Sequence, residues 1–313
     1  MATITTTPDV RLSALPPAVG RAGLRGAIAS EFTKLRSVRS TYWTLGALLI
    51  VAIGIGIAVT AGIDGNFANN PGQKGGFDAT QTSLIPFFGL GQLVIAVLGA
   101  MVITSEYSTG MIRTSLTAQP RRGVVYAAKA IVFGSITLVV SLVTSFVAFL
   151  VGQALLSGSG VSASLVHGAN VPANVMESPG PAGQNGPPLV TYQGHLVASA
   201  STVLTAVIGT ALFVTIVALI AFGVGAIIRH TAGAICTVIA MMFVVPLITQ
   251  ALPDSWRWDI LRFLPDGAGR VISVTIGGGN PHLWSAWPQL GVTALYAVVL
   301  VGIGAYLFRK RDA

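Results

Sequence analysis

The side chains that usually carry catalysis or bind metals are few and scattered in this chain. Cys236 is its single cysteine, which excludes an intrachain disulfide and a thiolate zinc cluster built within the chain. The histidines lack the i, i+4 pairing and the carboxylate neighbours that a metal site prefers; they are His167, His195, His230 and His282. No serine, histidine and aspartate set has a local signature. We therefore expect no enzyme activity, metal or cofactor in this chain itself.

Nucleotide chemistry is also missing from the sequence. No loop of the type Gly-x-x-x-x-Gly-Lys-Ser/Thr occurs, so the chain lacks the motif whose backbone N–H groups cradle ATP phosphates. Any use of ATP would therefore have to come from a partner.

The most informative polar stretch is Ser105–Gly123. Within it, Gly110 can break a helix and Pro120 enforces a turn, which predicts an ordered connector. A short apolar ridge between these breakers could dock into a groove on another protein; its members are Met111, Ile112 and Leu116. The charged residues of the stretch are Glu106, Arg113, Arg121 and Arg122, followed by Lys129. The alternative interpretation is a solvated basic connector.

The elements that hold this stretch belong to a membrane protein. Of the 313 residues, 53% are hydrophobic and only 9% are charged, against roughly 25% charged residues in a soluble domain. Crossing a bilayer core about 30 Å thick takes roughly 20 apolar residues of helix. Six uncharged stretches meet this requirement and predict an all-α integral membrane fold; their approximate bounds are 41–62, 84–104, 123–156, 196–228, 231–252 and 288–308.

The distribution of basic residues predicts the orientation of these spans. If alternate connections lie on opposite sides, 14 of the 18 lysine and arginine residues fall on one side. By the positive-inside rule this side is cytoplasmic, so both termini are inside. The same rule accounts for the net charge of +8 without nucleic-acid binding. We expect a multi-pass protein of the plasma membrane.

Residues 1–20 are rich in Thr, Pro and Ala and predict a disordered cytoplasmic tail, whereas 21–313 form one domain. After this tail, apolar residues recur at helical spacing and basic residues flank the apolar stripe. This pattern predicts an amphipathic helix on the inner leaflet of the bilayer. The residues are Leu24, Ile28, Phe32, Lys34, Leu35, Arg36 and Arg39. The alternative is a solvated helix that merely leads into the first span.

Two external segments differ in character. Ser157–Gly194 is rich in Gly, Pro, Ser and Asn and predicts an irregular loop or lid. The segment before the last span predicts a short amphipathic or re-entrant helix that packs against the mouth of the bundle; its apolar residues are Trp256, Ile260, Phe263 and Leu264, followed by Pro265.

Inside the spans, Pro246 predicts a kink or local unwinding. Small residues four apart, such as Ala96 and Ala100 or Ala221 and Gly225, would allow close helix approach. Tyr306 and Phe308 are expected as interfacial anchors. All six span centres lack ionisable residues; the polar residues Gln92, Ser141, Thr144, Ser145 and Gln153 would either line a path or hydrogen-bond between helices.

Three stretches resemble the permease subunits of type-two ATP-binding-cassette exporters. The first is Ser30–Leu45, similar to the N-terminal interfacial segment of such permeases, with Phe32 where a tryptophan is common. The second is Glu106, Gly110, Arg113, Pro120, Arg121 and Lys129, which resembles their coupling segment, with Met111 in place of a common threonine. The third is Phe263–Gly269, similar to a motif before their last span.

This resemblance implies a half-transporter. Two six-span subunits, identical or paralogous, would form one pathway for a lipophilic or amphiphilic substrate. Separate cytoplasmic ATPase subunits would bind ATP and Mg²⁺ and act on the coupling segment. Two other classes stay open: a non-transporting membrane scaffold or sensor, and an ATP-independent carrier or intramembrane enzyme.

Overall fold

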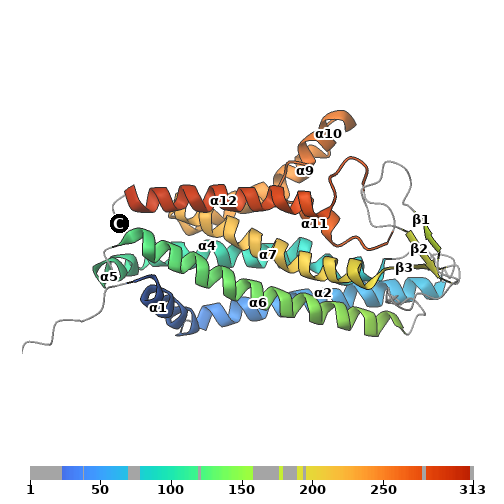
Figure 1. Cartoon of the computed structure of the whole chain (residues 1–313), viewed down its shortest axis with the longest axis horizontal. Coiled ribbons are helices and arrows are strands. Elements are labelled where there is room, and N and C mark those ends of the chain that lie inside the picture. The colour runs from blue at the N-terminus through green and yellow to red at the C-terminus, as the bar shows by residue number, and fades with distance from the viewer. Residues whose placement is uncertain are drawn as a thin grey trace, which may run out of the picture.

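The computed structural model describes residues 23–37, 39–69, 78–118, 121–157, 176–178, 189–192, 195–276 and 280–310. In this part of the chain, long helices lie roughly along one axis and form an elongated bundle (Figure 1). The helices are α1 (Leu24–Ser37), α2 (Arg39–Asn69), α3 (Ala79–Pro86), α4 (Gln92–Ser108), α5 (Met111–Ala118), α6 (Arg122–Ser157), α7 (Ala200–Ile228), α8 (Thr231–Ile239), α9 (Val245–Thr249), α10 (Asp254–Leu261), α11 (Gly267–Ile272) and α12 (Ala286–Lys310). The predicted tail, residues 1–20, lies outside the described residues.

Six segments of the described chain are long and apolar enough to cross a membrane. They are Leu45–Ile63, Ala79–Ser108, Arg122–Leu156, Ala200–Ile228, Thr231–Thr249 and Ala286–Lys310. Each overlaps one predicted span. The prediction of an all-α membrane protein with six spans is therefore confirmed.

The helix α7 is the centre of the bundle. In its most apolar window 72% of the residues are buried, compared with 22% in the first, fifth and last spans. Small residues bring α4 and α7 together, since a Cβ atom added to Gly99 would strike Ala221 and one added to Gly225 would strike Ile103 and Ala100. Thus the predicted small-residue pairs of the second and fourth spans do meet.

Two spans are interrupted by π-helical turns. The second span consists of α3, a turn at Phe87–Gly91 and α4, and the turn directly follows Pro86. The fifth span consists of α8, a turn at Ala240–Val244 and α9, whose second residue is Pro246. Proline removes a backbone donor, so the register of the helix changes beside it. The local unwinding predicted at Pro246 is therefore present as a π-helical turn, whereas the interruption at Pro86 was not predicted.

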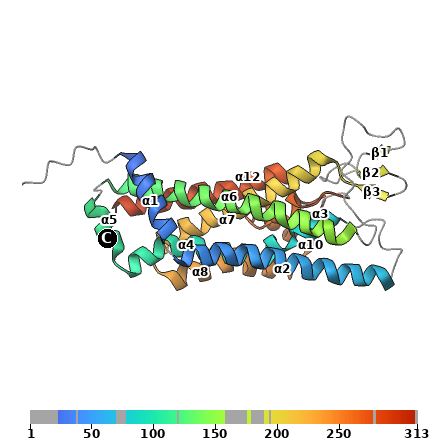
Figure 2. The same ribbon diagram turned by 90° about the horizontal axis from the view of Figure 1, so that it is seen from below.

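The two ends of the bundle differ. Helices α1 and α5 and the end of α12 gather at one end, which we call the α5 end, while the strands lie at the opposite end (Figures 1 and 2). Figure 2 shows α1 running across the bundle axis rather than along it. This placement is the one that the amphipathic pattern predicts for an interfacial helix.

The segment predicted as an irregular loop contains regular structure. An antiparallel sheet is formed by β1 (Met176–Ser178), β2 (Leu189–Tyr192) and β3 (His195–Val197), in the order β1-β2-β3. The register pairs Tyr192 with His195, so two residues of sequence connect the strands, the commonest length for a β-hairpin. The prediction of an irregular loop is wrong for these residues because Val190, Thr191 and Tyr192 favour strands.

The predicted external helix exists as α10, but a different element enters the mouth of the bundle. Trp258 of α10 and Leu264 pack with Val271 of α11 and with Leu283. It is α11 that fits between the spans, because Gly269 lies against Phe88 and Phe213 and would clash with them if it carried a side chain. The predicted short helix thus lies at the mouth through its contact with α11, a helix that the sequence analysis did not predict.

Candidate functional site

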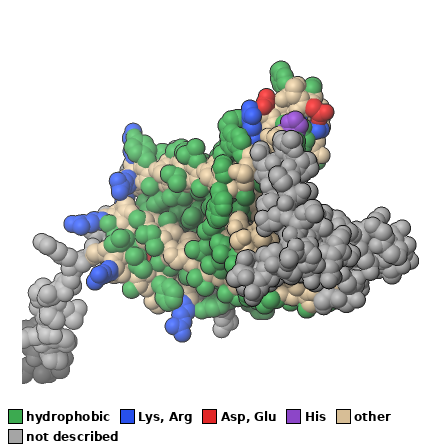
Figure 3. Space-filling view, turned by 45° about the vertical axis from the view of Figure 1, so that its right-hand side comes forward, with side chains coloured by type: hydrophobic (Ala, Val, Ile, Leu, Met, Phe, Trp, Pro, Cys, Tyr) green, Lys and Arg blue, Asp and Glu red, His purple; other side chains and the backbone are tan. Residues whose placement is uncertain are grey.

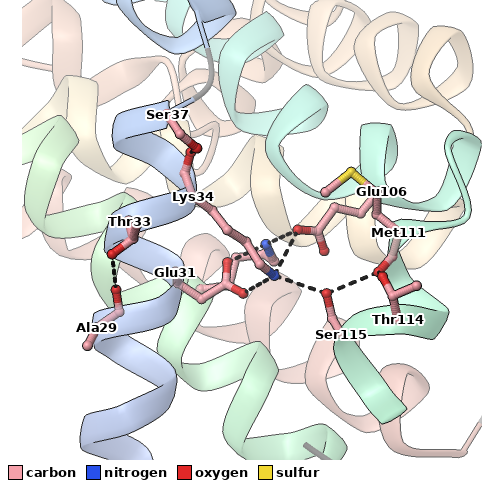
Figure 4. Close-up of polar contacts among 10 residues, drawn as sticks. Ala29, Glu31, Thr33, Lys34, Ser37, Glu106, Met111, Thr114 and Ser115 are labelled. Carbon is pink, nitrogen blue, oxygen red and sulfur yellow. Dashed lines mark hydrogen bonds and ion pairs between the residues drawn. The ribbon is translucent and has the colours of Figure 1, made fainter. Parts of the chain in front are cut away.

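Four charged side chains meet at the α5 end and form what we call the charge cluster: Glu31, Lys34, Glu106 and Lys129. The ammonium group of Lys129 lies 2.6 Å from Glu31 Oε2 and 2.7 Å from Glu106 Oε1. Lys34 Nζ lies 2.7 Å from Glu31 Oε1 and 3.7 Å from Glu106 Oε1. Figure 4 shows Glu31 and Lys34 on α1 facing Glu106 on α4. Lys129 comes from α6.

The charge cluster is buried and neutral. Glu31, Glu106 and Lys129 are 3%, 8% and 4% exposed, and Lys34 is half-buried. The charges of two carboxylates and two ammonium groups cancel. Such pairing is needed because an ionised group that is buried without a partner of opposite charge is strongly destabilising. Losing one partner would leave an uncompensated charge, so the four groups hold the helices as one unit.

The pKa values on α1 follow from this arrangement. Burial alone would raise the pKa of the Glu31 carboxyl, but the ammonium groups of Lys129 and Lys34 outweigh it and the pKa lies below its usual value of 4.5. Burial alone would lower the pKa of Lys34, but Glu31 and Glu106 outweigh it and the pKa lies above its usual value of 10.5. Both groups are therefore charged at neutral pH.

The connector helix α5 is attached to the same cluster. Lys34 Nζ donates to Ser115 Oγ at 3.0 Å, and Ser115 Oγ donates in turn to the carbonyl of Met111 (Figure 4). A hollow of about 390 Å³ lies over this contact. Its lining comes from α1, α5 and the start of α6: Ala27, Ser30, Glu31, Lys34, Met111, Thr114, Ser115 and Val125.

Gly110 makes the turn between α4 and α5. Its φ is +71°, in the left-handed region where a side chain is strained, and no atom lies within 4 Å of an added Cβ. The helix break predicted at this glycine is confirmed.

The predicted apolar ridge is divided rather than presented as a unit. Met111 is 46% exposed. By contrast, Ile112 is 3% exposed within the hydrophobic core of the bundle, and Leu116 packs against that core. Ile112 therefore helps to seat α5 on the bundle. Met111 is the part of the ridge that faces outward.

The other predicted residues of this end have different surroundings. Arg121 is exposed and Arg122 is half-buried at the start of α6. Pro120 and the side chains of Arg39 and Arg113 lie outside the described residues. On α1, Leu24 and Phe32 are exposed, Ile28 and Leu35 are half-buried, and Arg36 is exposed. The apolar stripe of α1 is thus only partly covered by protein, as an interfacial helix requires.

An aromatic cluster joins the charge cluster to the rest of the bundle; it consists of Tyr107, Tyr126, Phe133, Phe222 and Phe308. Tyr107 directly follows Glu106 on α4, and Tyr126 lies three residues before Lys129 on α6. The Tyr126 ring is 5.2 Å from that of Phe222 on α7 and 5.4 Å from that of Phe308 on α12. Its hydroxyl donates to the carbonyl of Val301 at 3.1 Å. The helices α4 and α6 therefore contribute to both clusters.

Phe308 was expected to be an interfacial anchor, and this expectation is wrong. It is 4% exposed because the rings of Tyr107 and Tyr126 pack around it. Tyr306, the other expected anchor, is 60% exposed.

The predicted residues at the opposite end are partly exposed and partly packed against the bundle. Trp256, Ile260 and Phe263 are exposed, whereas Leu264 is half-buried and Pro265 is buried. The stretch Phe263–Gly269 is bonded to α12, since the Pro265 carbonyl accepts a hydrogen bond from Thr293 Oγ1 at 2.9 Å.

Asp78 has a structural role at this end that the sequence analysis did not predict. Its carboxylate accepts three hydrogen bonds from Thr275 and Ile276, and it also caps α3.

Most of the polar residues predicted in the spans are enclosed by protein. Gln92, Ser141, Thr144 and Ser145 are each fully buried, and Gln153 is half-buried. The hydroxyls of Thr144 and Ser145 donate to carbonyls of their own helix, at Val140 and Leu142. These two hydroxyls therefore do not form the expected bonds between helices.

Comparison with known families adds one finding to this geometry. Residues 27–171 match the family described as ABC-2 family transporter protein. This part of the chain is therefore similar to the ABC-2 type permeases. The matched range contains all four members of the charge cluster, which lie on α1, α4 and α6, and it also contains α5. No curated protein matches the chain.

The ABC-2 similarity agrees with the six membrane-crossing segments and with the predicted resemblance. Sequence reasoning had already singled out Glu106 and Lys129, but it gave no role to Glu31. The only signal in the sequence was that Glu31 is an acidic residue within a basic amphipathic helix.

Proposed function

We propose that this chain is the membrane subunit of an ATP-driven exporter and that separate ATPase subunits bind its α5 end. The observation that carries the proposal is the charge cluster. It links α1 and, through Lys34, α5 to the second and third spans. A push on α5 or α1 would reach α4 and α6 directly through these ion pairs. The ATP and Mg²⁺ would belong to the partner ATPase.

The charge distribution supports a cytoplasmic location for the α5 end and for both termini. Lysine and arginine side chains stand out at that end in Figure 3, and hydrophobic side chains cover the middle of the molecule. The exposed basic residues of the described chain at that end are Arg25, Arg36, Arg121, Arg309 and Lys310. By the positive-inside rule such an end faces the cytoplasm, here of a plasma membrane.

The burial pattern supports a pathway formed by two subunits. The centre of one bundle is filled by α7, and the polar residues of the spans are buried between helices. A pathway would then lie between this chain and a second copy or a paralogue. Its walls would be apolar, which suits a lipophilic or amphiphilic substrate.

Affinity purification from the native membrane in mild detergent, followed by mass spectrometry, tests the partnership. We expect a soluble ATPase at one copy per permease. The reconstituted complex should then accumulate an amphiphilic dye in inside-out vesicles only when ATP is supplied. Repeated recovery without an ATPase would instead favour a membrane scaffold or sensor. Dye transport by the chain alone would overturn the exporter assignment.

The coupling role of α5 has its own test. Proline fixes φ near −65°, which the φ of +71° at Gly110 does not allow. Gly110→Pro should therefore displace α5, and Glu106→Lys should disrupt the charge cluster. We expect both variants to reach the membrane and to lose ATP-driven export while the ATPase still turns over. Gly110→Asn is the matched control, because asparagine tolerates positive φ. Failure of the variants to insert would contradict the coupling role.

A further inference from the structure

A second hollow lies within the membrane-spanning part of the protein, away from the charge cluster. It is a groove of about 470 Å³ on the surface of α6, α7 and α12, a size within the range of roughly 300–1,000 Å³ common for ligand pockets. We call it the α6/α12 groove. Its lining is Ala130, Ile131, Gly134, Ser135, Leu138, Thr215, Leu219, Ala297, Val298 and Val301.

The groove is apolar because small residues leave space between larger ones. Ala130 and Gly134 lie one turn apart on α6, and a Cβ added to Gly134 would meet only the end of the Leu219 side chain. The lining has two hydroxyl groups. That of Thr215 donates to the carbonyl of Ala211 in its own helix, and Ser135 lies at the exposed edge. A ligand in this groove therefore has to be hydrocarbon.

The groove has the depth of one leaflet. Ala130 and Leu138 are eight residues apart, about 12 Å along a helix, and one leaflet of the hydrocarbon core is about 15 Å thick. On α12, Val301 is followed after little more than a turn by Tyr306, which is 60% exposed. An exposed tyrosine at a helix end marks the membrane–water interface. The groove thus runs from the interface at the α5 end toward the bilayer centre.

Cationic side chains stand where the groove reaches this interface. Arg309 on α12 lies directly against Gly123 at the start of α6, so its guanidinium spans the two helices that border the groove. Lys310 Nζ lies 5.8 Å from the centre of the Tyr306 ring. Both residues are exposed. Basic pockets between spanning helices attract anionic lipid headgroups.

We propose that the α6/α12 groove binds one acyl chain of an anionic phospholipid, with the phosphate held by Arg309 and Lys310. The lipid comes from the leaflet at the α5 end. Hydrocarbon lining, leaflet depth and positive charge at the mouth all select this class of molecule. The proposal holds whether or not the protein exports a substrate, because the groove lies on the outer surface of a single bundle.

Lipid retention by the full-length protein tests the site. Protein purified in mild detergent is incubated with phosphatidylglycerol or with phosphatidylcholine of identical chains, and the lipid that remains per protein is measured by mass spectrometry. We expect at least five-fold more retained phosphatidylglycerol. Ser135→Trp should remove most of it by filling the groove from its exposed edge. Val139→Trp, one turn further and also exposed, should retain it.

Two further experiments test the contact with the lipid headgroup and the alternative that a second copy of the chain fills the groove. Arg309→Gln with Lys310→Gln should lower phosphatidylglycerol retention to that of phosphatidylcholine. Equal retention of both lipids by the unchanged protein, or equal loss in Ser135→Trp and Val139→Trp, would overturn the proposal. The remaining occupant is a second copy. A Ser135→Cys variant in a Cys236→Ser chain that forms a disulfide-linked dimer in membranes would also overturn it.

Discussion

At the scale of residues, Lys129 is a buried lysine whose charge is balanced by two carboxylates. The residue is 4% exposed, and its ammonium group lies within 2.7 Å of the carboxylates of Glu31 and Glu106. Breaking a buried ion pair by removing one partner costs about 3–5 kcal/mol, because the other charge stays buried. The charge cluster is therefore a place where one substitution can separate helices.

Lys129→Met should consequently lower the thermal unfolding temperature of the detergent-solubilised protein strongly. Adding Glu106→Gln removes one carboxylate and leaves Glu31 paired with Lys34, so the double variant should recover part of the loss. Arg25→Met, at an exposed arginine, is the control and should change little. If Lys129→Met is as mild as this control, the cluster does not hold the helices together.

The same cluster sets the response of the protein to acid. The folded pKa of Glu31 is below 4.5, so its stabilising contribution is complete above pH 4.5 and is lost as the pH falls further. The folded pKa of Lys34 is above 10.5, so its contribution is complete below pH 10.5 and is lost as the pH rises. Between these values the contribution of the pair is constant.

Thermal unfolding across this range checks the argument. The wild-type protein should lose stability below pH 4.5 more steeply than Glu31→Gln, which has no carboxyl to protonate at this position. Between neutral pH and 4.5 the difference in unfolding temperature between the two proteins should stay constant. Parallel acid limbs would show that folding does not lower the pKa of Glu31.

Sequence reasoning reached some of these residues and missed others. Glu106 and Lys129 were recognisable because they border a connector with helix breakers. Glu31 was not, because nothing in a helical pattern tells which side of an amphipathic helix will meet another element. Phe308 was misplaced for a related reason: an aromatic residue at a helix end serves either the interface or the core, and only packing decides.

At the scale of elements, α7 determines how closely the helices pack. A Cβ added to Gly223 would lie 2.7 Å from the Leu300 carbonyl carbon on α12, closer than van der Waals contact permits. The backbone of α12 cannot move aside as a flexible side chain can. A residue larger than glycine at this position therefore separates two spans.

Gly223→Val should thus destabilise the protein by a large fraction of its stability, measured as a fall in unfolding temperature and as aggregation in size-exclusion chromatography. The matched control is Gly302→Val on α12, where no atom lies within 4 Å of an added Cβ. The control should behave as the wild type. A similar fall in both variants would point to a general cost of valine in these helices rather than to the α7–α12 contact.

The spans themselves were predictable because a bilayer imposes a length and an apolar composition on any helix that crosses it. The order of packing was not predictable in the same way. The α7 segment has the highest mean hydropathy of the six, but an apolar span can face either lipid or other helices, and only the contacts show that α7 is buried. The short glycine-rich α11 was missed for a similar reason, since its sequence has no apolar stripe like that of α10.

At the scale of the whole molecule, the even number of spans and the asymmetry of charge make one prediction about orientation. Ser37 on α1 and Ser108 at the end of α4 are exposed near the α5 end, and Ser255 on α10 is exposed near the other. Cysteines at these positions, in a chain carrying Cys236→Ser, can be labelled one at a time in intact cells with a membrane-impermeant maleimide.

We expect Ser255→Cys to react in intact cells, and Ser37→Cys and Ser108→Cys to react only after the membrane is opened. The physical reason is that moving the α5 end outward would place its arginine and lysine residues against the positive-inside preference and away from cytoplasmic ATP. The reverse labelling pattern would contradict the orientation. It would also remove the exporter proposal, since ATPase subunits could then not reach the charge cluster. The lipid site would survive that result, but its phospholipid would come from the outer leaflet.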